Sequence, residues 1–260
     1  MELRLYQVDA FTDALFSGNP AAVCPLETWL PDAVMQKIAA ENNLSETAFY
    51  VRTDRGLHIR WFTPAVEVDL CGHATLASAY VVFTYDRHPG DTIEFASKSG
   101  PLKVRREGDL LVLDFPAGQP ERAAAPPGLV EALGREPVEI WRGKTDYLIV
   151  YETQEHVATL APNLADLGRV AARGIIVTAP GRQVDFVSRF FAPRVGVPED
   201  PVTGSAHTLL TPYWSRRLGK SVLSAMQLSK RQGWLRCRMA GDRVEIAGKA
   251  VPYLQGTITV

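Results

Sequence analysis

The chain has few cysteines, and they lie far apart. Only three occur in 260 residues, Cys24, Cys71 and Cys237, and no two of them form a C-x-x-C pair. This odd number and wide spacing argue against a disulfide framework and against a structural zinc site. The five histidines are equally scattered and no H-E-x-x-H motif occurs, so a metal site would have to be assembled from distant residues. We therefore expect no metal ion.

The sequence also lacks an excess of charge of either sign. Its 28 Lys and Arg residues against 29 Asp and Glu leave a formal net charge of −1, so no overall field draws the chain to nucleic acid or to an anionic membrane. No stretch approaches about 18 uninterrupted apolar residues, and the first residues lack the basic region and apolar run of a signal peptide. We expect a cytoplasmic protein with neither a nucleic-acid nor a membrane partner.

Nucleotide-binding and nucleophile motifs are missing as well. The Gly-Lys-Thr sequence at 143–145 has Val138 where a phosphate-binding loop needs glycine, and no G-x-G-x-x-G follows an expected strand. A G-x-S-x-G motif is not formed around Ser205, because Thr203 occupies its first glycine position. We expect no nucleotide cofactor, and no cofactor of another kind is indicated.

Strand patterns dominate what is present. The composition, 46% hydrophobic and 22% charged, is typical of a globular chain of one or two domains. Alternating or apolar runs rich in β-branched residues predict strands at 4–11, 47–51, 57–62, 92–96, 110–115, 147–151, 174–178, 184–191 and 256–260. Helical patterns occur at 31–42, 75–84, 165–173 and 206–218. The helices at 75–84 and 206–218 are apolar on most sides, so we expect each to run through a core.

An internal repeat relates the two halves. Residues 60–64, Arg-Trp-Phe-Thr-Pro, recur as Arg-Phe-Phe-Ala-Pro at 189–193, an offset of 129 residues. Ahead of them, Ile-Ala-Ala-Glu at 38–41 corresponds to Val-Ala-Ala-Arg at 170–173, an offset of 132. Several matches in one order predict two related lobes.

A segment near the middle has the composition of a linker. Residues 116–128 are rich in proline, alanine and glycine and follow neither the helical nor the strand period. We therefore expect the boundary between the two lobes near this segment.

Each half contains a turn of small residues just before its apolar helix, at Asp69–Thr75 and Glu199–His207. Such a turn exposes the N–H groups of the first helical turn, where the helix dipole favours an anion. The alternative is a pair of ordinary helices capped by Thr75 and Ser205. A matched pair in two lobes favours a cleft that clamps a small anionic metabolite.

Glu46 is a carboxylate in an unusual place. It shares a strand face with Ala48 and Tyr50, and the opposite face is equally apolar, so both are expected to be buried. A buried glutamate is rare without a partner, and burial disfavours a charged carboxylate, which suits a general acid/base. Its counterpart in the repeat is expected within Ile175–Val177, so Glu46 breaks the symmetry. The alternative is a glutamate that caps its own turn or pairs with an arginine.

Other candidates surround the two turns. Asp200 could accept a hydrogen bond from a substrate amine or merely from the backbone of its own turn. His73 is a candidate hydrogen-bond donor or proton shuttle, whereas His207 inside an apolar helix is expected to be a core residue. Cys71 could be a thiol base, but its counterpart is expected at Asp200 or Pro201, so a second thiol is missing and Cys71 is more often a packing residue.

Five segments resemble the signature of the phenazine-biosynthesis PhzF-like isomerases. They are Phe16–Val23, Asn43–Thr47, Asp69–Thr75, Asp200–His207 and Gln227–Gly233. The resemblance implies an α+β, diaminopimelate-epimerase-like fold: two pseudo-symmetric lobes, each a curled mixed β-sheet or barrel around a central helix, with the active site in the cleft between them. It also implies an N-terminal lobe at 1–118 that the last strand, at about 251–260, rejoins, and a C-terminal lobe at 119–250. The same resemblance implies a cofactor-free homodimer.

The same resemblance implies a role for individual residues. The glutamate that removes a C–H proton and returns it elsewhere on the same substrate falls on Glu46. Residues expected to hold substrate fall on Asn19, Ser45, Gly72, His73, Asp200, Thr203, Gly204 and Ser205. We therefore expect a cofactor-independent isomerase that moves a proton on a small carboxylated, amine-bearing metabolite. An amino- or imino-acid epimerase, racemase or dehydratase using Cys71, and a non-catalytic metabolite-binding protein, are the alternatives.

Overall fold

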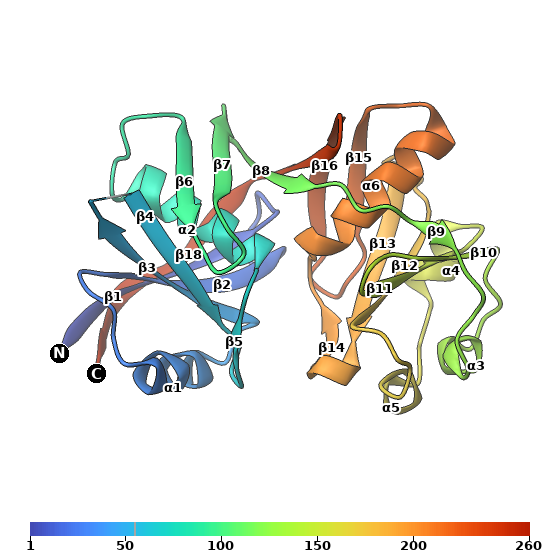
Figure 1. Ribbon diagram of the computed structural model, residues 1–260, viewed down its shortest axis with the longest axis horizontal. Helices are drawn as coiled ribbons and strands as arrows, with labels where there is room; N and C mark the ends of the chain where they lie inside the picture. The colour runs from blue at the N-terminus through green and yellow to red at the C-terminus, as the bar shows by residue number, and fades with distance from the viewer. Residues whose placement is uncertain (55) are drawn as a thin grey trace. The chain divides into compact units, whose positions relative to one another are not determined.

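The computed structural model describes residues 1–54 and 56–260. The chain forms two compact units, one made of Met1–Asp114 together with Ala247–Val260, the other of Phe115–Ile246. Each unit combines β-strands with a long buried helix and a few short helices (Figure 1). This confirms the α+β class.

The first unit is built around the helix α2 (Gly72–Thr84). Its other elements are β1 (Glu2–Ala10), β2 (Asn19–Leu26), α1 (Asp32–Asn42), β3 (Glu46–Thr53), β4 (Gly56–Phe62), β5 (Glu67–Val68), β6 (Thr92–Ala96), β7 (Leu102–Glu107), β8 (Leu110–Pro116) and β18 (Ala250–Thr259). Strands β2 and β3 are parallel, whereas β1 pairs antiparallel with both β2 and β18. The helix packs against β1, β2 and β3 and is buried along most of its length, as its apolar sequence predicts.

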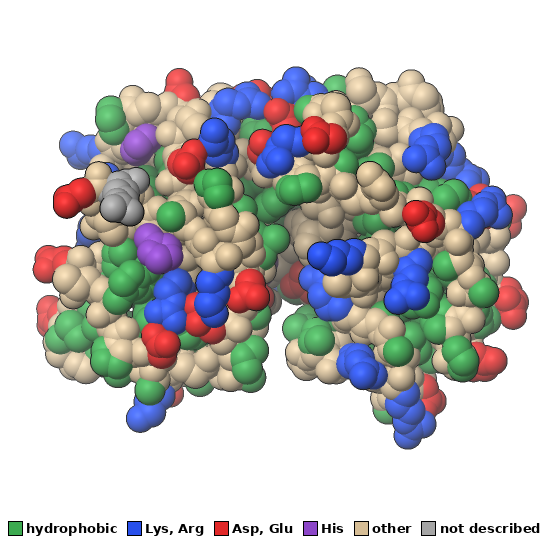
Figure 2. All heavy atoms as spheres, in the orientation of Figure 1, with side chains coloured by type: hydrophobic (Ala, Val, Ile, Leu, Met, Phe, Trp, Pro, Cys, Tyr) green, Lys and Arg blue, Asp and Glu red, His purple; other side chains and the backbone are tan. Residues whose placement is uncertain are grey.

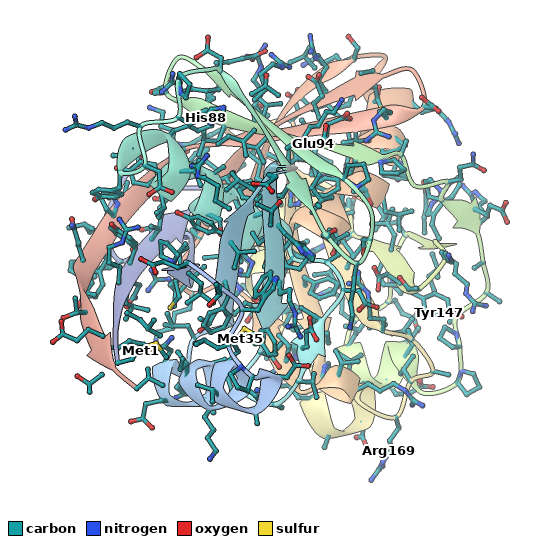
Figure 3. All side chains as sticks on the ribbon, turned by 60° about the vertical axis from the view of Figure 1, so that its left-hand side comes forward. Met1, Met35, His88, Glu94, Tyr147 and Arg169 are labelled. Carbon is teal, nitrogen blue, oxygen red and sulfur yellow. The ribbon has the colours of Figure 1, made fainter. Side chains whose placement is uncertain are left out.

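Helix α1 contributes a second layer to this unit. Met35 and Ile38 on its inner face pack with Phe49 of β3 and Phe62 of β4 in one buried cluster. Met35 is fully buried among these side chains (Figure 3). The outer face of the helix is exposed, so α1 is an ordinary amphipathic helix and its first residue is Asp32.

The second unit surrounds the helix α6 (Gly204–Leu218). Its other elements are β9 (Glu121–Arg122), α3 (Leu129–Leu133), β10 (Glu139–Arg142), β11 (Asp146–Val150), α4 (Gln154–Ala158), α5 (Leu164–Leu167), β12 (Gly174–Pro180), β13 (Phe186–Ala192), η1 (Pro193–Val195), β14 (Val197–Asp200), β15 (Val222–Gln227), β16 (Gly233–Ala240) and β17 (Arg243–Gly248). Strands β11 and β12 are parallel and β12 is antiparallel to β13, which repeats the order seen for β2, β3 and β4. Trp214 of α6 stacks on Phe186 at 5.7 Å and donates to the Thr178 hydroxyl at 3.0 Å.

One expected helix is wrong beyond its first turn. The segment 165–173 is helical only within α5, Leu164–Leu167, because Gly168 ends the helix. Arg169 points into solvent (Figure 3), and residues 170–173 form an irregular turn. Residues 38–41 are therefore helical whereas the matching residues 170–173 form a turn, so this sequence match is not part of the structural repeat.

No helix in the described part of the chain is long and apolar enough to cross a membrane. Positive and negative side chains are interspersed on the face drawn in Figure 2. This agrees with the balanced charge of the sequence.

Candidate active site

Glu46 is the first residue of β3 and lies opposite Ala21 of the parallel strand β2. The strand that follows it is buried on both faces, as expected, from Thr47 to Val51. Only 16% of the Glu46 side chain is exposed. A carboxylate is therefore held at the edge of an apolar core, where it needs a partner.

That partner is His73, the second residue of α2. Its Nε2 lies 3.1 Å from Oε2 of Glu46, and only 5% of the ring is exposed. Both atoms are buried. The contact between them does not have the geometry of a hydrogen bond, and neither atom makes a hydrogen bond to another described residue. A buried polar atom without such a bond is costly, and both atoms are therefore able to bind a further group at this place.

Two more side chains hold the other side of the His73 ring. Nδ2 of Asn19, the first residue of β2, lies 3.1 Å from Nδ1 of His73. The Cys71 thiol, at the N-cap of α2, lies 3.5 Å from the same nitrogen. The structure thus brings together Asn19, Glu46 and His73 of the expected site residues and adds Cys71. Ser45 precedes Glu46 and is half-buried.

The environment fixes the charges of this cluster. Burial, and after it the nearby Glu46 carboxylate, raises the pKa of the Cys71 thiol to about 11, so the thiol is neutral at physiological pH. Burial by itself lowers the pKa of His73, but Cys71 and Glu46 outweigh it and raise that pKa well above its usual range. Because the thiol carries no charge, the Glu46 carboxylate is what keeps the proton on the ring.

Three of these side chains could together hold a metal ion. One donor atom each from Glu46, Cys71 and His73 lies within 4.8 Å of the other two. The sequence separates them by up to 27 positions, so only the fold reveals the cluster.

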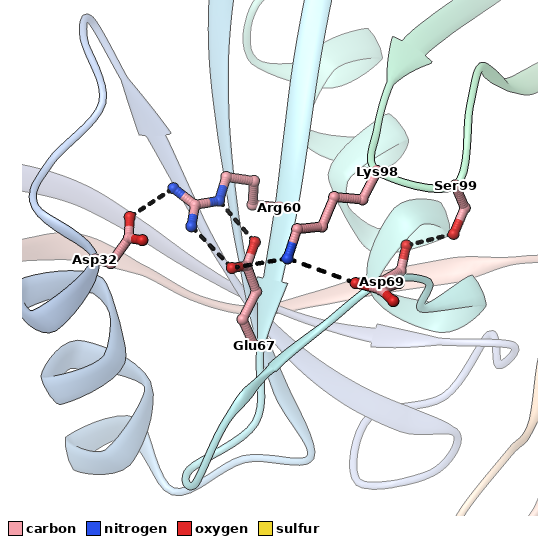
Figure 4. A network of polar contacts seen from close by, with 6 residues as sticks. All are labelled: Asp32, Arg60, Glu67, Asp69, Lys98 and Ser99. Atoms are coloured by element: carbon pink, nitrogen blue, oxygen red, sulfur yellow. Dashed lines mark hydrogen bonds and ion pairs between the residues drawn. The ribbon is translucent and has the colours of Figure 1, made fainter.

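A polar network holds the turn that leads into α2 (Figure 4). Arg60 binds both carboxylate oxygens of Glu67, at 2.7 and 2.9 Å. Lys98 lies within ion-pair distance of Glu67 and Asp69, at 3.5 and 3.6 Å, and the Ser99 hydroxyl donates to the Asp69 carbonyl at 2.8 Å. These bonds fix the backbone a few residues before His73.

The second unit contains the corresponding turn. Thr203 is the N-cap of α6, and Gly204 and Ser205 are its first two residues. The Thr203 hydroxyl donates to a carboxylate oxygen of Asp200 at 2.5 Å. Asp200 therefore accepts a hydrogen bond within its own turn, but from a side-chain hydroxyl and not from the backbone donor that the sequence suggested.

Gln227 is a residue of this turn that sequence reasoning did not include among the site residues. It is fully buried, its Oε1 accepts from the Thr203 N–H at 2.9 Å, and its Nε2 donates to the Asp200 carbonyl at 2.8 Å. The side chain therefore ties together both ends of the turn. Its place in the Gln227–Gly233 segment was the available signal.

Arg173 and Asp146 were missed as well. The Arg173 guanidinium binds both oxygens of Asp146, whose side chain is 8% exposed, and also donates to the Ser205 hydroxyl at 3.2 Å. The sequence did not indicate Arg173, because the helix predicted at 165–173 would place an arginine on its solvent-exposed surface. The second unit thus has its own carboxylate beside its central helix, but an arginine neutralises it.

The strand registers correct the counterpart of Glu46. Phe49 lies opposite Arg60 as Val177 lies opposite Arg189, so Glu46 corresponds to Gly174 and not to a residue within 175–177. A Cβ at Gly174 would lie 2.3 Å from the Phe190 ring, which leaves no room for a side chain. The asymmetry between the units is therefore built into the packing.

The helix starts correct two further expectations. Both helices begin earlier than predicted, at Gly72 and Gly204, so Thr75 and Ser205 are not their caps. The N-caps are Cys71 and Thr203, and neither makes a side-chain capping hydrogen bond. The counterpart of Cys71 is therefore Thr203, a hydroxyl, and not Asp200 or Pro201. The expectation that a second thiol is missing there still holds.

Comparison with known proteins places this geometry in context. A family model described as phenazine biosynthesis-like protein matches residues 8–256. An uncharacterized isomerase of Pseudomonas aeruginosa is 55% identical over 258 residues, which cover 99% of both chains.

Solved structures are similar over the same length. The crystal structure of a PhzF-family phenazine biosynthesis protein from Enterococcus faecalis is 48% identical, with a TM-score of 0.97 over all of both chains. A predicted epimerase of Pseudomonas aeruginosa has a TM-score of 0.76 over 99% of both chains, and its 19% identity makes it a likeness of fold alone. The expected epimerase-like fold is confirmed.

Proposed function

The chain belongs to the phenazine biosynthesis-like PhzF family, and from this premise we propose that it is a cofactor-independent isomerase that moves a proton on a small carboxylated metabolite. Glu46 is the general acid/base of this proposal. The observation that carries it is a carboxylate on a buried apolar strand, 3.1 Å from Nε2 of His73, with neither atom satisfied by a hydrogen bond.

The proposed reaction conserves atoms and electrons. The Glu46 carboxylate takes a proton from a substrate carbon, and the electron pair of that C–H bond moves into an adjacent conjugated system. Glu46, now a neutral acid, returns the proton to another carbon on the same face, and no oxidant or reductant is consumed. The protonated His73 stabilises the carboxylate at the start and end of the cycle, while the Cys71 sulfur, 3.5 Å from Nδ1, accepts from its second N–H and orients the ring.

We propose that the first turns of α2 and α6 hold the substrate. The backbone N–H groups at Gly72 and His73, and at Gly204 and Ser205, suit a carboxylate, because no N-cap side chain occupies them. That both turns serve one cleft, with Asp200 accepting from a substrate amine, is part of the proposal and rests on the family resemblance. A cytoplasmic homodimer is the expected form, and light scattering after size-exclusion chromatography tests its mass.

A second candidate is an epimerase, racemase or dehydratase that uses Cys71 as the base. The 3.5 Å approach of the Cys71 sulfur to Nδ1 of His73 favours it, because His73 in its neutral form could take the thiol proton at this distance. The raised pKa of the thiol and the hydroxyl of Thr203 at the place of a second thiol weigh against it.

Proton exchange tests the proposal without knowledge of the natural substrate. Small carboxylates, with and without amino groups, are first screened for thermal stabilisation of the protein. Each compound that stabilises it is then incubated with enzyme in D₂O, and deuterium incorporation at carbon is followed by NMR. We expect exchange with the native protein and none with Glu46→Gln. Exchange that survives in Glu46→Gln but disappears in Cys71→Ser would favour the second candidate, and stabilisation without any exchange would favour a binding protein.

A further inference from the structure

Three side chains in the first unit bring a sulfur, a nitrogen and an oxygen donor to one place. One such atom from each of Glu46, Cys71 and His73 lies within 4.8 Å of the other two. They come from the start of β3 and the start of α2, so both supporting backbones are regular structure. Cys71 is 6% exposed and His73 is 4% exposed, which restricts their movement.

The distances in the cluster are close to those of a metal site. The Cys71 sulfur and Nδ1 of His73 are 3.5 Å apart. Zinc bound to sulfur at about 2.3 Å and to imidazole nitrogen at about 2.0 Å with tetrahedral angles separates these two donors by roughly 3.5 Å. The third donor is a carboxylate oxygen of Glu46, and one donor atom from each of the three residues lies within 4.8 Å of the other two.

The cluster also contains buried polar atoms that make no hydrogen bond among the described residues. Nε2 of His73 and Oε2 of Glu46 are buried without a hydrogen bond, although they lie 3.1 Å apart. Only 5% of the His73 side chain is exposed.

The donor set selects the class of ion. Thiolate and imidazole ligands suit Zn²⁺ and similar ions, whereas Mg²⁺ and Ca²⁺ prefer oxygen alone. A thiolate from Cys71 and a carboxylate from Glu46 together balance two positive charges, and a neutral complex is the least costly to bury.

We propose that Glu46, Cys71 and one ring nitrogen of His73 form a binding site for a divalent cation of the zinc type, and that the bound ion blocks proton transfer by Glu46. The inhibitory part rests on the proposed function. The binding part does not, because it depends only on the three donors.

Cobalt provides a direct test of binding. Co²⁺ is titrated into the metal-free full-length protein, and the thiolate-to-cobalt charge-transfer absorption is recorded. We expect this band in the native protein, its loss in Cys71→Ser and Cys71→Ala, and affinity lower by about 10-fold or more in Glu46→Gln. Cys237→Ala, which removes a buried thiol of the other unit, is the control and keeps the band. Mg²⁺ does not displace the cobalt, whereas Zn²⁺ does.

Each of the other outcomes contradicts one part of the proposal, either the binding site or its blocking role. A native protein without the band at saturating Co²⁺, or a band that persists in both folded Cys71 variants, overturns the site. The inhibition is tested separately by deuterium exchange in the native protein with Zn²⁺ or with Mg²⁺, and we expect Zn²⁺ to stop the exchange and Mg²⁺ to leave it unchanged. Exchange that continues with the site filled overturns the blocking role. If no compound undergoes exchange at all, the isomerase proposal fails while the cobalt spectrum still decides binding.

Discussion

Arg60 and Arg189 bind a glutamate in the same way at equivalent places of the two units. In both, Nε lies 2.7 Å from one carboxylate oxygen, and Nη2 lies 2.9 or 3.0 Å from the other. The partners are Glu67 in the first unit and Glu199 in the second. The repeat that the sequence indicates at 60–64 and 189–193 is therefore a repeat of structure.

The two arginines differ in their remaining partners, which predicts different contributions to stability. Arg189 also donates to the carbonyls of Val157 and Leu160, whereas the further hydrogen bond of Arg60 goes to the exposed carboxylate of Asp32. We expect Arg189→Met to lower the free energy of unfolding by about 3 kcal/mol, because it removes the guanidinium from the Leu160 carbonyl and from the Glu199 carboxylate, and Arg60→Met by about 1 kcal/mol. Urea unfolding of both variants measures this.

Lysine substitutions are the control for charge. Arg189→Lys and Arg60→Lys keep the positive charge but lose the bidentate contact with the carboxylate. The free energy of unfolding of each should therefore lie between that of the methionine variant and that of the native protein. Equal losses for the two methionine variants would contradict the argument, since Lys98 remains beside Glu67 only in the first unit.

Glu46→Gln is expected to remove most turnover and little binding. The amide keeps the size of the side chain but cannot take a proton, and a positioned acid/base typically contributes about 10²–10⁴-fold. The rate of deuterium exchange and the thermal stabilisation by the same compound measure the two effects. Glu41→Gln is the matched control, because Glu41 lies on the exposed face of α1, and this variant should behave like the native protein. An unchanged exchange rate in Glu46→Gln would remove Glu46 from the mechanism.

Gly174→Ala tests why the second unit has no counterpart of Glu46. Its Cβ would lie 2.3 Å from the Phe190 ring and 3.1 Å from Asp146, so we expect destabilisation of about 1–3 kcal/mol. Gly256→Ala is the control, because nothing lies within 4 Å of that Cβ. Calorimetric melting of both variants provides the comparison, and a Gly174→Ala protein as stable as the native one would show that the ring moves aside easily.

His207 predicts a loss of stability in acid. It is fully buried, and burial lowers its pKa from 6.5 to about 4, while Nδ1 lies 2.8 Å from the Thr203 carbonyl. The unfolded chain takes up the proton first, so this contribution to stability is complete above pH 6.5 and is lost as the pH falls from 6.5 to 4. The full loss from this group is about 3 kcal/mol.

The pH effect is isolated by difference. The free energy of unfolding is measured at several pH values for the native protein and for His207→Gln, in which the titrating ring is absent. The variant should lose less stability between pH 6.5 and pH 4 than the native protein does. Parallel curves for the two proteins would contradict a neutral, buried His207.

Much of the fold is readable from local patterns, and the exceptions have physical causes. The alternating segment 92–96 is β6 with the same bounds. Strand β2 was missed because Pro20 and Pro25 disfavour a strand, although parallel pairing with β3 tolerates them. Strand β16 was also missed, but the alternation of buried Leu235 and Cys237 with exposed neighbours was a usable signal.

The candidate site was only partly readable. Strand alternation identified Glu46, because a charged residue in a buried period-2 pattern is conspicuous. The approach of Glu46 to His73 could not be read, since it depends on how β3 packs against α2. The pair of Arg173 and Asp146 was hidden for a similar reason, because an irregular turn and a strand end meet only in the folded unit.

The two ends of the chain meet in the first unit. The Val260 N–H donates to the Met1 carbonyl at 2.8 Å, and β18 pairs with β1 along its length. Because residues 115–246 of the second unit lie between the two parts of the first, the ribosome completes the second unit before it makes the strand that closes the first. The second unit can therefore fold during synthesis before the first, which needs β18. Joining the ends by a short linker and opening the chain between residues 246 and 247 would make the first unit continuous in sequence and place it ahead of the second.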